Sequence, residues 1–230
     1  GNGGDTLIYS QSDDDDGEVH WFELPLAGGE AKEILTDVGV EQAYIDRRSR
    51  RFIGYALTGD MPAYRFLDAH QQKVVNATLK AFPGLAVTLI DWNDAFDALI
   101  VKTEGGDDPQ SWWLVDIKTG RATPLGQSYL VPAAEVGPVK IIRYKAGDGT
   151  EIPGILTLPP GREAKNLPVI IFPHGGPASH DSVGFDWWAQ AFAVRGYAVL
   201  QPNFRGSTGY GPAFERAGYG EWGRKMQTDM

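Results

Sequence analysis

The chain has 230 residues, and its hydrophobic fraction of 42% is large enough for a packed core, which excludes a disordered tail. Its net charge of -9 argues against nucleic-acid binding, because an acidic surface repels phosphate backbones. The absence of cysteine excludes disulfides, thiolate metal sites and cysteine nucleophiles.

No apolar run approaches the roughly 20 residues that a membrane-spanning helix needs, so we expect no membrane partner. The first residues contain neither Met nor a basic segment, so no signal peptide is visible. The compartment, cytoplasm or periplasm, and the oligomeric state stay open. We expect no cofactor and no metal ion.

A repeated pattern occupies the first 130 residues. Residues 45–55 resemble residues 90–100, an offset of 45 positions, and each copy is a strand, a polar turn and a second strand. A third strand follows in each, at 64–68 and 112–116, and a short fourth strand comes next, most clearly at 117–125.

Four strands in about 45 residues is the period of a β-propeller blade. Residues 20–24 look like the third strand of a preceding unit, so two full units and one partial unit are visible. The alternative is a β-sandwich with coincidental spacing.

The acidic run at residues 13–16 lies between two strands of the first unit, and we interpret it as a solvated hairpin tip rather than a calcium site, because four consecutive Asp side chains cannot converge on one ion.

The pattern changes near residue 136. The segment at 167–172 is an almost continuous apolar run, typical of a central strand covered on both faces. A helix is predicted next, with one apolar face and a stop at Gly196, and another apolar strand follows, so the spacing indicates a βαβ crossover and a parallel sheet. The predicted elements are strands at 136–144, 152–158, 167–172 and 197–202 and a helix at 185–195, its apolar face formed by residues 185, 188, 189, 192 and 193.

The loop between the apolar strand and the helix contains His174, Gly175 and Gly176. Glycines allow a sharp turn whose backbone N–H groups can point at a developing negative oxygen. This is the position of the His-Gly-Gly oxyanion loop of α/β-hydrolases. A tight strand-to-helix turn without catalytic use is the alternative.

Three segments carry a family resemblance: residues 173–177, 195–200 and 203–211, the last reading Asn-Phe-Arg-Gly-Ser-Thr-Gly-Tyr-Gly. Through them the chain resembles the prolyl oligopeptidase family of serine peptidases, above all its acylaminoacyl-peptidase and dipeptidyl-peptidase-like branches. The resemblance covers residues 136–230 well, and the earlier half matches in architecture. It implies a mixed fold: a partial β-propeller of about two to three blades at 1–135, followed by the N-terminal part of an α/β-hydrolase domain at 136–230.

The resemblance also implies a Ser–His–Asp peptidase gated by the propeller and acting on peptide substrates. Gly175 would lend its N–H to the oxyanion hole. His174 stands where some relatives carry a Tyr that donates its hydroxyl, and we expect His174 and Gly176 to shape the loop. Arg205 is expected to order the glycine-rich segment rather than to bind substrate.

The nucleophile motif Gly-x-Ser-x-Gly is absent from the sequence. Two near matches, at Ser182 and Ser207, lack the first glycine and do not stand between a strand and the start of a helix, so we reject both. Since the chain order in this fold is Ser, Asp, His, we expect all three beyond Met230, and therefore an internal fragment that is inactive alone.

Two other readings stay open: a non-catalytic binding module with a degenerate hydrolase domain, and an α/β-hydrolase esterase, which the 45-residue period argues against. The Trp112–Trp113 and Trp187–Trp188 pairs are interpreted as core. Substrate length, residue preference and the choice between exopeptidase and endopeptidase cannot be read from the sequence.

Overall fold

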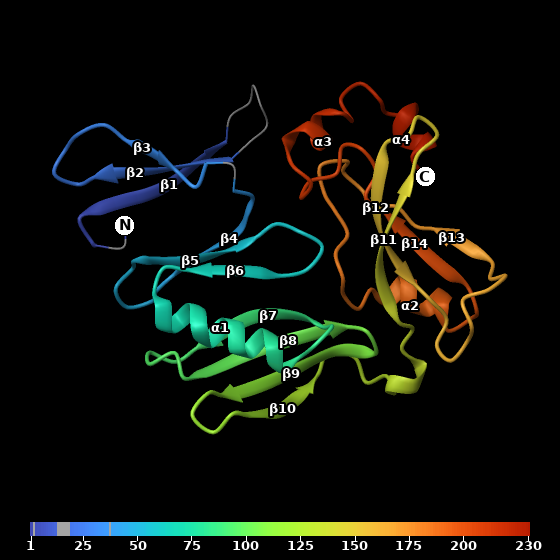
Figure 1. Cartoon of the computed structure of the whole chain (residues 1–230), viewed down its shortest axis with the longest axis horizontal. Coiled ribbons are helices and arrows are strands. Elements are labelled where there is room, and N and C mark those ends of the chain that lie inside the picture. Colours follow the sequence, from blue (N-terminus) through green and yellow to red (C-terminus); the bar gives the residue numbers. More distant parts are fainter. Residues whose placement is uncertain (2, 13–18, 37) are drawn as a thin grey trace.

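The computed structural model describes residues 1, 3–12, 19–36 and 38–230, so the acidic run at 13–16 lies outside the described residues. The described chain forms four sheets, three of which follow one another along the first half, while the fourth lies beside them (Figure 1). None of the helices in this part of the chain is both long and apolar enough to cross a bilayer.

The first three sheets are antiparallel, and within each the strands lie side by side in chain order. This order results from short connections between strands that are adjacent in sequence. Their strands are β1 (Thr6–Ser12), β2 (Val19–Pro25) and β3 (Lys32–Ile34); β4 (Val40–Ile45), β5 (Phe52–Leu57) and β6 (Ala63–Phe66); and β7 (Ala86–Trp92), β8 (Ala98–Gly105), β9 (Asp108–Asp116) and β10 (Arg121–Gln127).

The predicted offset of 45 residues differs slightly from the offset between the paired strands. Next to the turn, Ile45 pairs with Phe52 and Trp92 pairs with Leu99, an offset of 47, and farther along Gln42 pairs with Ala56 and Thr88 pairs with Lys102, an offset of 46. The offset changes because the register shifts at different places in the two hairpins, between Tyr44 and Ile45 in the first and at the bulged Ile90 in the second. A bulge inserts a residue without ending the strand, so sequence similarity alone did not locate the change of offset.

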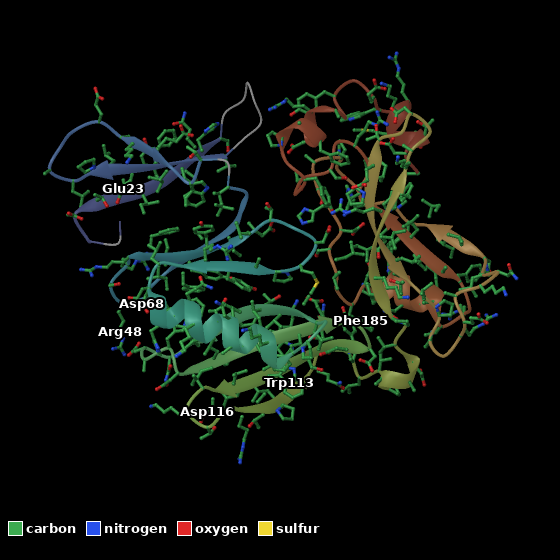
Figure 2. The ribbon with its side chains drawn as sticks, in the orientation of Figure 1. Glu23, Arg48, Asp68, Trp113, Asp116 and Phe185 are labelled. Carbon is green, nitrogen blue, oxygen red and sulfur yellow. The ribbon has the colours of Figure 1, made fainter. Side chains whose placement is uncertain are left out.

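The repeat predicted a fourth strand after β6 in the unit formed by β4, β5 and β6. At this place the chain forms the helix α1 (Ala69–Ala81). Asp68, labelled in Figure 2 beside the start of this helix, caps it by accepting a hydrogen bond from the N–H of Gln71 at 2.9 Å. The helix places Val75 in an apolar cluster that also contains Leu99 and Val101, all three with no exposed surface. The fourth-strand prediction is therefore wrong for this unit, because the cap and the apolar face at helical spacing favour a helix.

Replacing Asp68 by alanine is expected to lower the free energy of unfolding by about 1 kcal/mol, because the Gln71 N–H at the helix start loses its acceptor. Urea unfolding of the chain measures this effect. The control is Lys73→Ala on the exposed face of the same helix, which should stay within about 0.5 kcal/mol of the parent. Equal losses in the two variants would contradict the capping role.

The fourth sheet has the strand order β11–β12–β14–β13, and β13 and β14 run parallel. The predicted βαβ crossover is confirmed, because the helix α2 joins these two strands, and Gly196 follows it with φ 96°. The elements are β11 (Val139–Lys145), β12 (Glu151–Thr157), β13 (Val169–Ile171), α2 (Trp187–Ala193) and β14 (Ala198–Pro202), followed by the short helices α3 (Pro212–Arg216) and α4 (Lys225–Thr228).

Two expectations for this region are wrong. Among the described strands β13 is an edge strand rather than a central one, and Val169 and Ile171 are exposed. Trp187 and Trp188 are about half exposed, so neither this pair nor the full predicted face of α2 is core. The apolar run predicts a central strand, which needs a hydrogen-bonded strand on each edge. The described chain places a strand, β14, on only one edge of β13.

Candidate active-site loop

The glycine turn, residues 173–180, follows the carboxyl end of β13 and leads toward α2. Ligands in open α/β sheets bind outside the carboxyl ends of the parallel strands. Gly176 has φ 130°, and a Cβ built on it would lie 2.9 Å from the N of Ala178, so only glycine fits this position without strain. The Gly176–Pro177 peptide bond is cis.

The N–H groups of Gly175 and Gly176 are unpaired within the described residues, where neither donates a hydrogen bond to a protein acceptor. Both glycines are exposed. A Cβ on Gly175 would meet no atom within 4 Å, so the space beside this amide is open. Two exposed, unpaired donors on a turn can stabilise an oxygen that gains negative charge.

His174 holds the turn through three contacts. Its ring stacks on Phe204 with centroids 4.7 Å apart, its Nδ1 lies 2.8 Å from the carbonyl oxygen of Gly175, and its Nε2 lies 2.9 Å from the Oγ of Ser207. Both ring nitrogens are thus occupied by neighbours within the chain. These contacts fix the ring and the adjacent peptide, which suits a residue that shapes the loop.

The His174–Ser207 contact has the spacing of a nucleophile and its general base, but Ser207 cannot act as one. Its side chain has no exposed surface, and its hydroxyl donates to the carbonyl oxygen of Phe204 at 2.7 Å. A nucleophile must reach a substrate carbonyl. Ser182 is exposed, yet no histidine of the described chain lies within hydrogen-bond distance of it.

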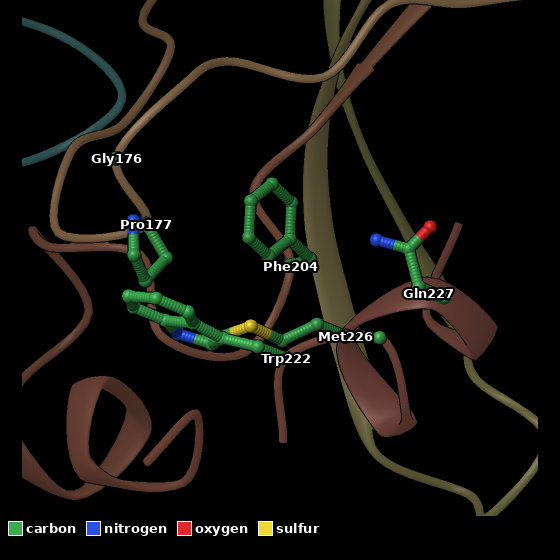
Figure 3. Close-up of a pocket in the computed structure, with 7 residues that line it drawn as sticks. Gly176, Pro177, Phe204, Trp222, Met226 and Gln227 are labelled. Carbon is green, nitrogen blue, oxygen red and sulfur yellow. The ribbon is translucent and has the colours of Figure 1, made fainter. Parts of the chain in front are cut away.

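Hollows lie on two sides of the turn. One, of about 430 Å³, is lined by residues that include His174, Gly175, Asp181 and Trp188. The other, of about 200 Å³, is largely apolar, and Figure 3 shows Phe204, Met226 and Trp222 close to Pro177 in its wall. The glycine turn therefore borders open space on both sides.

Asp181 is a charged group of the first hollow that sequence reasoning missed. Burial raises the pKa of its carboxyl, and its Oδ2 is buried without a hydrogen-bond partner. No motif marks this residue in the sequence. The described residues contain no cluster of three or more His, Asp or Glu that could hold a metal ion.

Residues 183–230 match the model of the prolyl oligopeptidase family. Dipeptidyl aminopeptidase BIII of Pseudoxanthomonas mexicana is 42% identical over 141 residues, and dipeptidyl peptidase family member 6 of Caenorhabditis elegans is 52% identical over 62 residues. The chain is similar to members of the prolyl oligopeptidase family. These alignments take in 57% and 27% of this chain but only 20% and 8% of the two relatives, so the chain spans a small part of their length.

Solved peptidase structures share the fold of this chain. The acylaminoacyl peptidase of Pyrococcus horikoshii aligns with a TM-score of 0.66 at 20% identity, covering 98% of this chain and 35% of that one. The puromycin-hydrolyzing peptidase of Mycobacterium tuberculosis aligns with a TM-score of 0.64 at 21% identity, covering 96% and 36%. The fold similarity therefore includes the first three sheets, where the sequence match to the family model is absent.

Proposed function

We propose that this chain is part of a serine peptidase that hydrolyses peptide bonds of short peptides by acyl transfer, and that the Gly175 N–H is an oxyanion-hole donor. The unpaired, exposed Gly175 amide at the carboxyl end of β13 is the observation that carries this proposal. The named relatives are dipeptidyl peptidases, which supports peptides as the substrate class. His174 and Gly176 act by shaping the turn.

We further propose a division into two modules. Residues 1–135 form part of a β-propeller, each antiparallel sheet being one blade, and residues 136–230 form the N-terminal part of an α/β-hydrolase domain. The repeated hairpins of β4–β5 and β7–β8 support the first assignment, and the parallel β13–α2–β14 unit supports the second. The short helix at Ala133–Glu135 coincides with the proposed boundary.

In this proposal the Ser, Asp and His of the triad are supplied by residues outside this sequence, and the 230-residue chain alone is inactive. Ser182 and Ser207 then react with no acylating probe. A fluorophosphonate should leave the isolated chain unlabelled and should label one serine in a longer polypeptide that contains it.

Mass spectrometry of the treated proteins locates the label. The variant Ser182→Ala serves as the control, and it should not change labelling of the longer polypeptide. Labelling of either serine in the isolated chain contradicts the assignment of the nucleophile. A longer polypeptide that takes no label contradicts the peptidase proposal itself.

A further inference from the structure

The exit strip, residues 181–185, runs from the glycine turn toward α2 and is held by other parts of the chain. Every second N–H group of this strip donates to an acceptor from another segment: Asp181 to Asn203 Oδ1 at 2.7 Å, Val183 to the Asp60 carbonyl oxygen at 3.2 Å, and Phe185 to Glu104 Oε2 at 3.2 Å. Asp60 lies between β5 and β6, and Glu104 lies in β8. Two of the three acceptors therefore come from the first three sheets.

Packing holds the exit strip in the same place. Val183 is 7% exposed and belongs to an apolar cluster that joins both halves of the chain: Ala86 and Met61 come from the first half, and Ile155 and Val139 come from the second. The ring of Phe185 lies 4.8 Å from that of Tyr129, and Figure 2 shows Phe185 at the junction between the two halves. Moving the strip would expose these side chains to water.

Tyr210 adds a second connection from Asp60 to the strip. Its hydroxyl donates to Asp60 Oδ1 and accepts from Asn203 Nδ2. The amide of Asn203, which has no exposed surface, also donates to the carbonyl oxygen of Asp181 at 2.8 Å. Burial, followed by the hydrogen bond to Asp60, raises the pKa of Tyr210, so its hydroxyl keeps the proton that it donates.

We propose that Asp60 and Tyr210 are positioning residues: through the exit strip they fix the glycine turn, so the β4–β6 sheet controls where the Gly175 and Gly176 N–H groups point. One end of the turn is fixed by β13, and the other end is fixed by the strip. A shift of the first three sheets relative to the fourth would pull on the second end and move the turn. The consequence for catalysis rests on the proposed function, whereas the effect on the turn does not.

Amide hydrogen exchange and backbone NMR of this chain test the inference without any substrate. In Tyr210→Phe and Asp60→Ala we expect the amides of the exit strip to exchange roughly three- to tenfold faster, and the Gly175 and Gly176 resonances to shift, because a hydrogen-bonded connection is lost. Asp60→Asn keeps an acceptor for Tyr210 and should restore most of the protection.

Tyr64→Phe is the matched control. The Tyr64 hydroxyl is also buried, donates to the Val87 carbonyl oxygen at 2.8 Å and accepts from the Leu89 N–H, but it lies wholly within the first half. This variant should speed exchange in β7 and leave the exit strip within about twofold of the parent.

Unchanged strip exchange and glycine resonances in Tyr210→Phe would overturn the inference, and so would an equal change in Tyr64→Phe, which would indicate a general loss of stability. If Asp60→Ala does not fold, Tyr210→Phe decides the question, because it removes a single oxygen. The exchange and NMR measurements need no enzymatic activity. A failed labelling experiment on the longer polypeptide would therefore contradict the proposed function without affecting this test of the positioning residues.

Discussion

Replacing Gly175 by proline is expected, under the proposed function, to lower kcat of a longer polypeptide that carries the triad by about 10²- to 10³-fold and to leave KM nearly unchanged. Proline has no N–H, so the substitution removes one oxyanion donor while keeping the backbone atoms of the turn. An oxyanion donor acts mainly on the transition state, where the substrate oxygen carries its charge, and the loss therefore falls on kcat. Hydrolysis of dipeptide substrates with a chromogenic leaving group measures both constants.

Gly175→Ala is the control for this substitution. It keeps the N–H, and its Cβ would meet no atom within 4 Å, so we expect kcat within a few-fold of the parent. A kcat equally reduced in Gly175→Ala would indicate that the shape of the turn matters and not its amide. A kcat unaffected by Gly175→Pro in a folded enzyme would remove Gly175 from the oxyanion hole.

Sequence patterns predicted most of the strands and the helix α2, because the signal for each of these elements lies in residues that are close together in the sequence. The hairpins at 45–55 and 90–100 and the β13–α2–β14 crossover depend on alternating apolar residues, turns and a helical period. The bulge at Ile90 and the helix α1 were missed for different reasons. A bulge has no strong sequence signal, and the expectation of a repeated strand took precedence over the cap at Asp68.

Long-range partners limited the prediction of the candidate site. The glycine turn was found from its motif, and so was the unsuitability of Ser207, but nothing local indicates that His174 would contact Ser207 or that Asp60 would hold Tyr210. Asp60 and Tyr210 are 150 positions apart. The edge position of β13 could not be predicted for the same reason: its apolar run indicates a buried strand but does not indicate which strands pair with it.

Replacing Arg205 by alanine is expected to lower the free energy of unfolding of this chain by about 3–5 kcal/mol. The guanidinium is almost fully buried and bonds the Asp229 carboxylate with two nitrogens, at 2.7 and 2.6 Å, while Nη2 also lies 2.9 Å from Asp148. The side chain of Asp229 has no exposed surface, so the substitution leaves a buried carboxylate without its cation. Arg205 thereby joins the glycine-rich segment to α4 and to the β11–β12 hairpin, which suits the ordering role expected from the sequence.

Urea unfolding at neutral pH measures this loss, with Arg195→Ala as the exposed control, expected within about 0.5 kcal/mol of the parent. Arg205→Lys keeps the charge and loses the paired hydrogen bonds, so its stability should lie between the two. A loss below about 1 kcal/mol in Arg205→Ala would contradict a buried ion pair that the fold depends on.

Acid unfolding of an Asp148→Asn variant tests the second carboxylate that contacts Arg205. Hydrogen bonds from Thr150, with a smaller contribution from Arg205, lower the pKa of Asp148 to about 2. An acid whose folded pKa lies below its unfolded value of about 3.9 stabilises the fold above that value, and the stabilisation is lost as the pH falls toward 2. Asp148→Asn removes this ionisable group and leaves the Arg205–Asp229 pair in place, so its unfolding free energy should fall less steeply than the parent's between pH 4 and 2, and equal slopes would contradict a lowered Asp148 pKa.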